Sequence, residues 1–269
     1  MDGNLLPGGE SKPAQLLQET TQPAPPSLPG PELPSPSVPT PSNDRRLRLI
    51  ELVLVSVVAF GGSILASAFY LLGLNASTSI GGSLTWANGI VHEAGCLGLV
   101  WYVLARRSRT FSDLGFSPAG MDVAWSILLF IAGSISVSVV HWGIRASGLT
   151  SVSESAASAR VGQILFGGGV SAVTILFQFV NPFFEELIVR GYVMTEVNHL
   201  TRSAAKAVLV STLLQTSYHF YQGAPLAFSQ GAMFALFSVY YAKTNRLTPI
   251  ILAHLYLDWY GTLWYMLRH

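Results

Sequence analysis

The distribution of hydrophobic residues changes sharply at Arg45. From Arg45 to the C-terminus, long apolar runs alternate with short polar segments. A bilayer core about 30 Å thick needs about 20 helical residues to span it, and seven runs have about that length or more. They cover residues 47–73, 80–104, 121–145, 161–198, 203–221, 225–243 and 247–267. The pattern predicts an all-α fold, a polytopic transmembrane helical bundle of about seven membrane helices.

The fourth run is too long for one straight span. It contains Asn181-Pro182, and a proline cannot donate a hydrogen bond to the carbonyl one turn earlier, here that of Gln178. We expect the helix to weaken at Pro182, or to start anew there with Asn181 as its N-cap. A split at this point would raise the number of membrane helices to eight.

The basic residues predict the orientation of these spans. With the N-terminus in the cytoplasm, most arginines and lysines of the loops fall on the cytoplasmic side, as the positive-inside rule requires. The residues on that side are Arg45, Arg46, Arg48, Arg106, Arg107, Arg109, Arg202, Lys206, Lys243 and Arg246. The opposite side receives Arg145, Arg160 and Arg268. Seven spans with a cytoplasmic N-terminus are therefore favoured.

The first 44 residues have a different composition. They hold 11 of the 15 prolines and no aromatic residue, and such a segment cannot bury enough apolar surface to offset chain ordering. We expect a disordered Pro-rich tail at 1–44 and a membrane-embedded domain at 45–269. A docking segment for a partner is the alternative interpretation of the tail.

Composition and charge narrow the function classes. Half of the residues are hydrophobic and 11% are charged, against about 25% charged in average soluble domains, which excludes an ordinary soluble enzyme. The net charge is +1, and nothing indicates a nucleic-acid partner. The single cysteine, Cys96, excludes an intramolecular disulfide. We expect an integral, multi-pass protein of the plasma membrane.

Ionisable residues at membrane depth are rare and usually functional. Here they are His92, Glu93, Glu185, Glu186, Arg190, His219, His254 and Asp258. Glu186 and Arg190 are four positions apart, so they share a helix face and can pair. Glu185 points about 100° away from Glu186 and can face something else. We expect a structural hydrogen-bonding role for His92 and Glu93, with a site ligand as the alternative.

The remaining ionisable residues lie at similar depths in the predicted membrane helices. His254 and Asp258 share a helix face. Counted from the cytoplasmic boundaries, Glu185, His219, His254 and Asp258 lie about 16, 20, 12 and 18 Å deep. These residue types suit hydrolysis, because Glu185 and His219 can deprotonate a water while His254 and Asp258 stabilise an oxyanion or orient the water. A divalent metal such as zinc, held by Glu185, His219 and His254, is the other possibility that the spacing leaves open.

Three motifs in order resemble a known family. Glu185-Glu186-x-x-x-Arg190, the later His219 and His254-x-x-x-Asp258 look like the motifs of the CPBP intramembrane protease family. This family includes CAAX prenyl endopeptidases and bacteriocin-processing or self-immunity proteins. The resemblance covers roughly residues 100–267, the expected protease core, and takes in the short element Asp113-Leu114-Gly115-Phe116.

The resemblance implies an intramembrane endopeptidase acting on a membrane-associated protein or peptide. It implies that Glu185 activates water with help from His219, and that His254 and Asp258 support the oxyanion. It also implies that Glu186 and Arg190 hold the site. Of the glutamic and metalloprotease mechanisms argued for the family, we favour the glutamic one.

The sequence departs from the family pattern at two positions. The residue four before His219 is Gln215, where the family usually has Phe, and the last motif ends in Asp258 rather than the frequent Asn. An ionised Asp cannot donate a hydrogen bond, which puts the oxyanion role of Asp258 in question.

Two other functions are compatible with the same helices. One is a non-catalytic membrane protein of the same fold, acting in bacteriocin self-immunity or as a scaffold. The other is a proton-coupled transporter, against which the absence of internal repeats counts.

Overall fold

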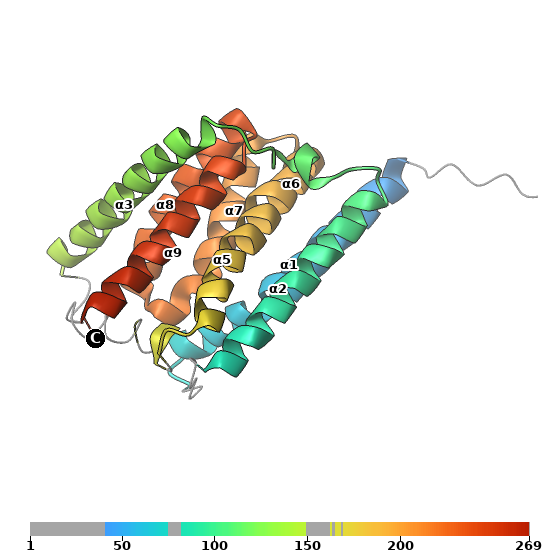
Figure 1. Ribbon diagram of the computed structural model, residues 1–269. Helices are drawn as coiled ribbons and strands as arrows, with labels where there is room; N and C mark the ends of the chain where they lie inside the picture. Colours follow the sequence, from blue (N-terminus) through green and yellow to red (C-terminus); the bar gives the residue numbers. More distant parts are fainter. Residues whose placement is uncertain (1–40, 75–81, 149–161, 163–164, 168, 269) are drawn as a thin grey trace, which may run out of the picture. The chain divides into compact units, whose positions relative to one another are not determined.

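Every regular element in the described part of the chain is helical (Figure 1). The computed structural model describes residues 41–74, 82–148, 162, 165–167 and 169–268. The elements are α1 (Pro41–Leu71), α2 (Ser83–Ala105), η1 (Phe111–Leu114), α3 (Asp122–Ala146), α5 (Ala172–Glu186), η2 (Leu187–Met194), α6 (Thr195–Thr201), α7 (Ala204–His219), η3 (Phe220–Gln222), α8 (Ala224–Thr244) and α9 (Thr248–Arg268). The predicted all-α fold is confirmed, and each of the seven predicted runs contains helix.

Three helical stretches are long and apolar enough to cross a membrane. They are Asp44–Leu71, Asp122–Ala146 and Ala172–Thr201. That the other predicted runs also cross the membrane stays a prediction. The cytoplasmic location of the N-terminus stays one as well. The predicted tail lies outside the described residues except for its last four, where α1 already begins at Pro41.

Of the two outcomes expected at Asn181-Pro182, a new start of the helix is wrong. Helix α5 continues through Pro182 to Glu186, and the π-helix η2 and then α6 follow. One missing backbone donor does not end this helix, because neighbouring helices pack around it. Asn181 is therefore not an N-cap but an interior residue of α5.

The fourth run forms the centre of the bundle. All eight residues of η2 are buried, and η2 contacts α1, α2, α5, α6, α7 and η1. Around it, α2 packs against α5, α5 against α9, and α7 against α1 and α8, while α3 covers α8 and α9 (Figure 1). The segment that carries Glu185, Glu186 and Arg190 thus lies where most of the helices meet.

The loop after α2 is hydrogen-bonded to the end of α8 and to the segment that follows it. Gly115 has φ +84°, and its carbonyl accepts a hydrogen bond of 3.0 Å from Leu247 N. A Cβ at Gly115 would lie 2.0 Å from the carbonyl oxygen of Asn245. The Tyr241 hydroxyl donates to Leu114 O at 3.0 Å. Glycine is required here because of both the left-handed backbone and the close approach.

Ion pairs join α1, α2 and α6 at the same end of the bundle. Glu196 is buried and accepts from Arg48 at 3.3 Å and from Arg107 at 2.8 Å. Arg107 also pairs with Glu51. We call Glu196 with Arg48 and Arg107 the Glu196 hub.

Candidate active site

The two adjacent glutamates at the end of α5 have different surroundings. Glu186 has no exposed surface and accepts a hydrogen bond of 3.1 Å from Arg190. Its Oε1 also lies 2.8 Å from Nδ1 of His254, on α9. Arg190 in turn donates to the carbonyl of Phe234 at 3.2 Å, and its guanidinium lies 5.5 Å from the centre of the Phe234 ring. Glu186 is thus held between the guanidinium of Arg190 and the imidazole ring of His254.

Glu185 is held by amides instead. Gln215 Nε2, on α7, donates to Glu185 Oε2 at 2.7 Å. Asn181 Nδ2, one turn earlier on α5, lies 3.5 Å from Glu185 Oε1. Glu185 is 7% exposed, and the hydroxyl of Tyr218 also lies near it, outside hydrogen-bond geometry. Neutral donors orient this carboxylate and leave it able to accept a proton.

Gln215 also fixes the ring of His219. The backbone carbonyl of Gln215 lies 2.8 Å from Nδ1 of His219. A carbonyl can only accept, so Nδ1 carries a proton, and in the neutral ring Nε2 then carries the lone pair. The centres of the His219 and Phe234 rings are 4.8 Å apart. Electrostatic interactions link Glu185 to both His219 and His254.

His254 lies between two carboxylates. Its Nδ1 faces Glu186, and its Nε2 lies 3.8 Å from Asp258 Oδ1, too far for a hydrogen bond. Asp258 is partly exposed. If the ring carries both protons, Glu186 and Asp258 are its counter-charges, and the Nε2 proton is available to another acceptor.

The structure therefore brings the six predicted site residues together from α5, η2, α7 and α9. The predicted pairs Glu186 with Arg190 and His254 with Asp258 face each other as their spacing implied. The chemical roles of these residues stay predictions.

Two further residues, Gln215 and Asn181, contact this cluster, and Glu93 is joined to it through Asn181. Gln215 stood out in the sequence only as a departure from the family pattern, and Asn181 only as a possible cap. Glu93 was assigned a structural role together with His92, but the two side chains diverge. Glu93 Oε1 accepts from Asn181 at 2.8 Å, whereas His92 Nε2 faces the carbonyl of Ala59 on α1 at 3.2 Å.

The proposed metal ligands do not form a metal-binding group. Among the residues that the structure describes, no three His, Cys, Asp or Glu side chains are arranged to hold a metal ion. The donor set in this geometry does not fit the zinc alternative.

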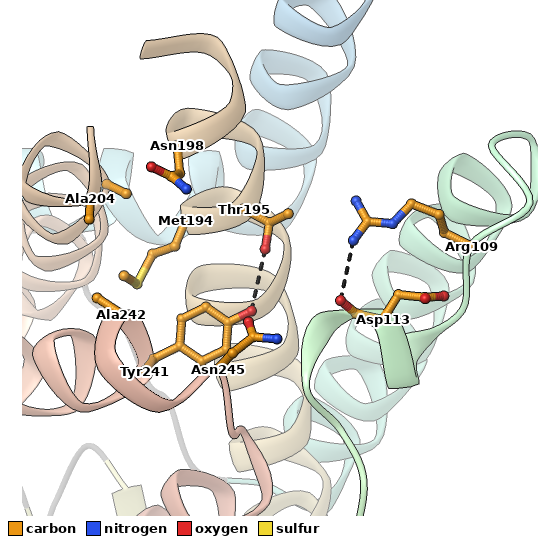
Figure 2. Close-up of a pocket in the computed structure, with 10 residues that line it drawn as sticks. Arg109, Asp113, Met194, Thr195, Asn198, Ala204, Tyr241, Ala242 and Asn245 are labelled. Atoms are coloured by element: carbon orange, nitrogen blue, oxygen red, sulfur yellow. Dashed lines mark hydrogen bonds between the residues drawn. The ribbon is translucent and has the colours of Figure 1, made fainter. Parts of the chain in front are cut away.

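A pocket of about 240 Å³ lies apart from this cluster (Figure 2). Within it Tyr241 and Thr195 hydroxyls are 3.3 Å apart, and Arg109 donates to the carbonyl of Asp113 at 3.2 Å. The lining residues are Arg109, Asp113, Met194, Thr195, Asn198, Ala204, Ala207, Tyr241, Ala242 and Asn245. None of the predicted site residues is among them.

Comparison with known proteins supports the motif-based resemblance. Residues 167–260, about a third of the chain, match the family described as type II CAAX prenyl endopeptidase Rce1-like. No curated protein and no solved structure matches the chain. The family match confirms the predicted resemblance to CAAX-type intramembrane proteases and implies peptide-bond hydrolysis. With the apolar helices, it indicates an integral membrane protein.

Proposed function

We propose that this chain, with its Rce1-like segment at residues 167–260, is an intramembrane endopeptidase of the glutamic type. It hydrolyses a peptide bond of a membrane-associated protein or peptide. Glu185 activates the water with help from His219, and His254 with Asp258 supports the oxyanion. Glu186 and Arg190 hold the site.

The observation that carries this proposal is the contrast between Glu185 and Glu186. Glu186 pairs with the guanidinium of Arg190 and contacts Nδ1 of His254, which supports a structural role. Glu185 receives hydrogen bonds from the neutral amides of Gln215 and Asn181. A buried carboxylate is unfavourable unless it is paired or functional. Two adjacent acids in such different environments are typical of a division of roles.

The proton transfers follow from these contacts. A water molecule donates one hydrogen bond to Glu185 and a second to Nε2 of His219, the nitrogen that carries the lone pair. The water oxygen attacks the carbonyl carbon of the substrate as Glu185 takes the proton. Glu185 then returns this proton to the leaving nitrogen as the C–N bond breaks. The products are a carboxylic acid, which keeps the second proton of the water, and an amine, and Glu185 ends ionised as it began. The acid then passes its proton to the more basic amine, which leaves a carboxylate and an ammonium group.

The oxyanion is assigned to His254. Negative charge develops on the carbonyl oxygen during the attack, and a positioned N–H donor stabilises it. The Nδ1 proton of His254 is already donated to Glu186. Nε2 of the same ring can therefore donate only in the imidazolium form, in which both ring nitrogens carry a proton. Asp258, 3.8 Å from Nε2, supplies the counter-charge and does not donate. This role accommodates the departure from the frequent Asn at this position.

The substrate class follows from the family and from the position of the site. The matching family is described by its action on prenylated CAAX proteins, so a prenylated C-terminal peptide is the first substrate to test. The proposal itself extends to a peptide bond of any membrane-associated protein that reaches the α5–α7–α9 cluster.

The test is a survey of peptide termini in host membranes, together with cleavage of a prenylated peptide by the purified protein. Glu185→Gln and His219→Gln should each abolish the new termini. His199→Gln, the same substitution at an exposed histidine of α6, should preserve them. Identical termini for the wild type and Glu185→Gln would favour a non-catalytic role in immunity or as a scaffold.

A further inference from the structure

Helix α2 contributes one acid to the candidate site from outside the segment that matches the family. Glu93 is 3% exposed and lies on α2, 88 positions before its partner Asn181 on α5. The helices approach closely because Gly89 lies one turn before Glu93. A Cβ at Gly89 would be 2.7 Å from the ring of Phe177, and Trp86 packs 4.6 Å from the same ring.

One amide connects this acid to Glu185. Asn181 Nδ2 lies 2.8 Å from Glu93 Oε1 and 3.5 Å from Glu185 Oε1. An amide nitrogen carries two hydrogens, so one can be directed at each carboxyl group. The short contact with Glu93 fixes which way the Asn181 amide faces. Without it the amide is free to turn its oxygen towards the carboxylate of Glu185, which would repel it.

We propose that Glu93 is a positioning residue for Glu185 and acts through the side chain of Asn181. The inference rests on the proposed function, since it assigns Glu93 a part in the same hydrolysis. Glu93 does not contact the reacting atoms and exchanges no proton with the substrate. It accepts one hydrogen bond from Asn181, and the second hydrogen of that amide then orients Glu185 towards the water.

The burial of Glu93 supports a role beyond packing. Its Oε2 is buried with no hydrogen-bond partner among the described residues, and the carboxyl groups of Glu185 and Asp258 oppose a negative charge on Glu93. An apolar residue would pack α2 against α5 without this desolvation penalty. The acceptor oxygen facing Asn181 is the feature that an apolar residue lacks.

The experiment compares three variants of the full chain in the prenylated-peptide assay. Glu93→Gln keeps an acceptor oxygen and should retain kcat within about threefold of the wild type. Glu93→Leu removes the acceptor and should lower kcat about 10- to 100-fold with an unchanged KM, because small displacements of catalytic groups have effects of that order. Asn181→Leu should have the same effect as Glu93→Leu.

Two controls separate this inference from a structural role. His92→Leu alters the adjacent residue, which contacts α1, and should leave kcat unchanged. The double variant of Glu93→Leu with Asn181→Leu should be no slower than Asn181→Leu alone, because the two residues act through one hydrogen bond. If Glu93→Leu does not fold, Asn181→Leu and Glu93→Gln still carry the test.

The outcomes also separate this inference from the proposed function. If the wild type cleaves, Glu185→Gln does not, and Glu93→Leu keeps the wild-type kcat, then the role of Glu93 is refuted while the protease stands. Equal losses in Glu93→Gln and Glu93→Leu would refute it as well, since they would point to the carboxyl proton. If Glu185→Gln cleaves like the wild type, the proposed function itself fails.

Discussion

The side-chain amide of Gln215 donates a hydrogen bond of 2.7 Å to Glu185, a residue 30 positions earlier in the chain. The backbone carbonyl of the same Gln215 accepts from His219 at 2.8 Å. One residue of α7 thereby sets the positions of both groups proposed to activate the water. Gln215, which stands where the family usually has Phe, therefore contacts the site directly.

Gln215→Leu should therefore lower kcat about 10- to 100-fold, because Glu185 loses the donor that orients its Oε2. The variant should also be less stable by about 1–3 kcal/mol, since a buried carboxylate oxygen is left without a partner. Thr216→Val is the matched control, as it removes only a bond to the carbonyl of Thr212 within α7. Steady-state rates and thermal unfolding in detergent would measure both effects. Wild-type kcat in Gln215→Leu would contradict the assigned role.

Arg190→Met should destabilise the fold strongly. It leaves Glu186 buried with the His254 ring as its remaining partner, and breaking a buried ion pair has an effect of about 3–5 kcal/mol. The double variant Glu186→Gln with Arg190→Met should recover part of this loss, because the unpaired charge is gone. Arg109→Met, which loses an exposed bond to the carbonyl of Asp113, is the control. Equal unfolding temperatures for the two arginine variants would show that the buried pair adds nothing.

Gly115→Ala should destabilise the protein without touching the site residues. A left-handed backbone is unfavourable for alanine by about 1–3 kcal/mol, and the added Cβ would clash with the carbonyl of Asn245 at 2.0 Å. At Gly120 a Cβ meets nothing within 4 Å, so Gly120→Ala should unfold like the wild type. Thermal unfolding of the two variants compares them directly. A wild-type unfolding temperature for Gly115→Ala would mean that the loop can move away from α8.

Chelators should leave the cleavage rate unchanged. The described residues offer no group of three metal ligands, and the proposed water activation uses Glu185 and His219 alone. The rate is measured before and after dialysis against a strong chelator, with the metal content of the purified protein determined in parallel. Activity that disappears on dialysis and returns with zinc would overturn the glutamic mechanism.

The positions of the helices could be predicted from the sequence, because long apolar runs leave little choice of structure in a bilayer. The Glu186–Arg190 pair could be predicted too, since it depends on helix periodicity alone. The expected alternative of a new helix start at Pro182 was wrong, because the packing around α5 keeps the helix continuous. A proline removes one hydrogen bond, and the burial of the helix on several sides outweighs that loss.

The contacts between helices could not be read from the sequence. Glu93 was visible as an acid at membrane depth, but its partner lies 88 positions later. Asn181 was assigned to its own backbone, whereas its side chain reaches two other carboxyl groups. Which residues face each other depends on how each helix is rotated, and hydrophobicity is a weak guide to rotation when lipid surrounds the bundle.

The Glu196 hub determines when the N-terminal helices can complete their packing during synthesis. Arg48 and Arg107 leave the ribosome 148 and 89 residues before their shared acceptor, Glu196. During synthesis, α1 and α2 are thus made with two cations whose common partner does not yet exist. Glu51 can hold Arg107 in that interval. The arrival of α6 then locks these two helices onto the core, so that assembly of the N-terminal helices is completed by a segment synthesised much later.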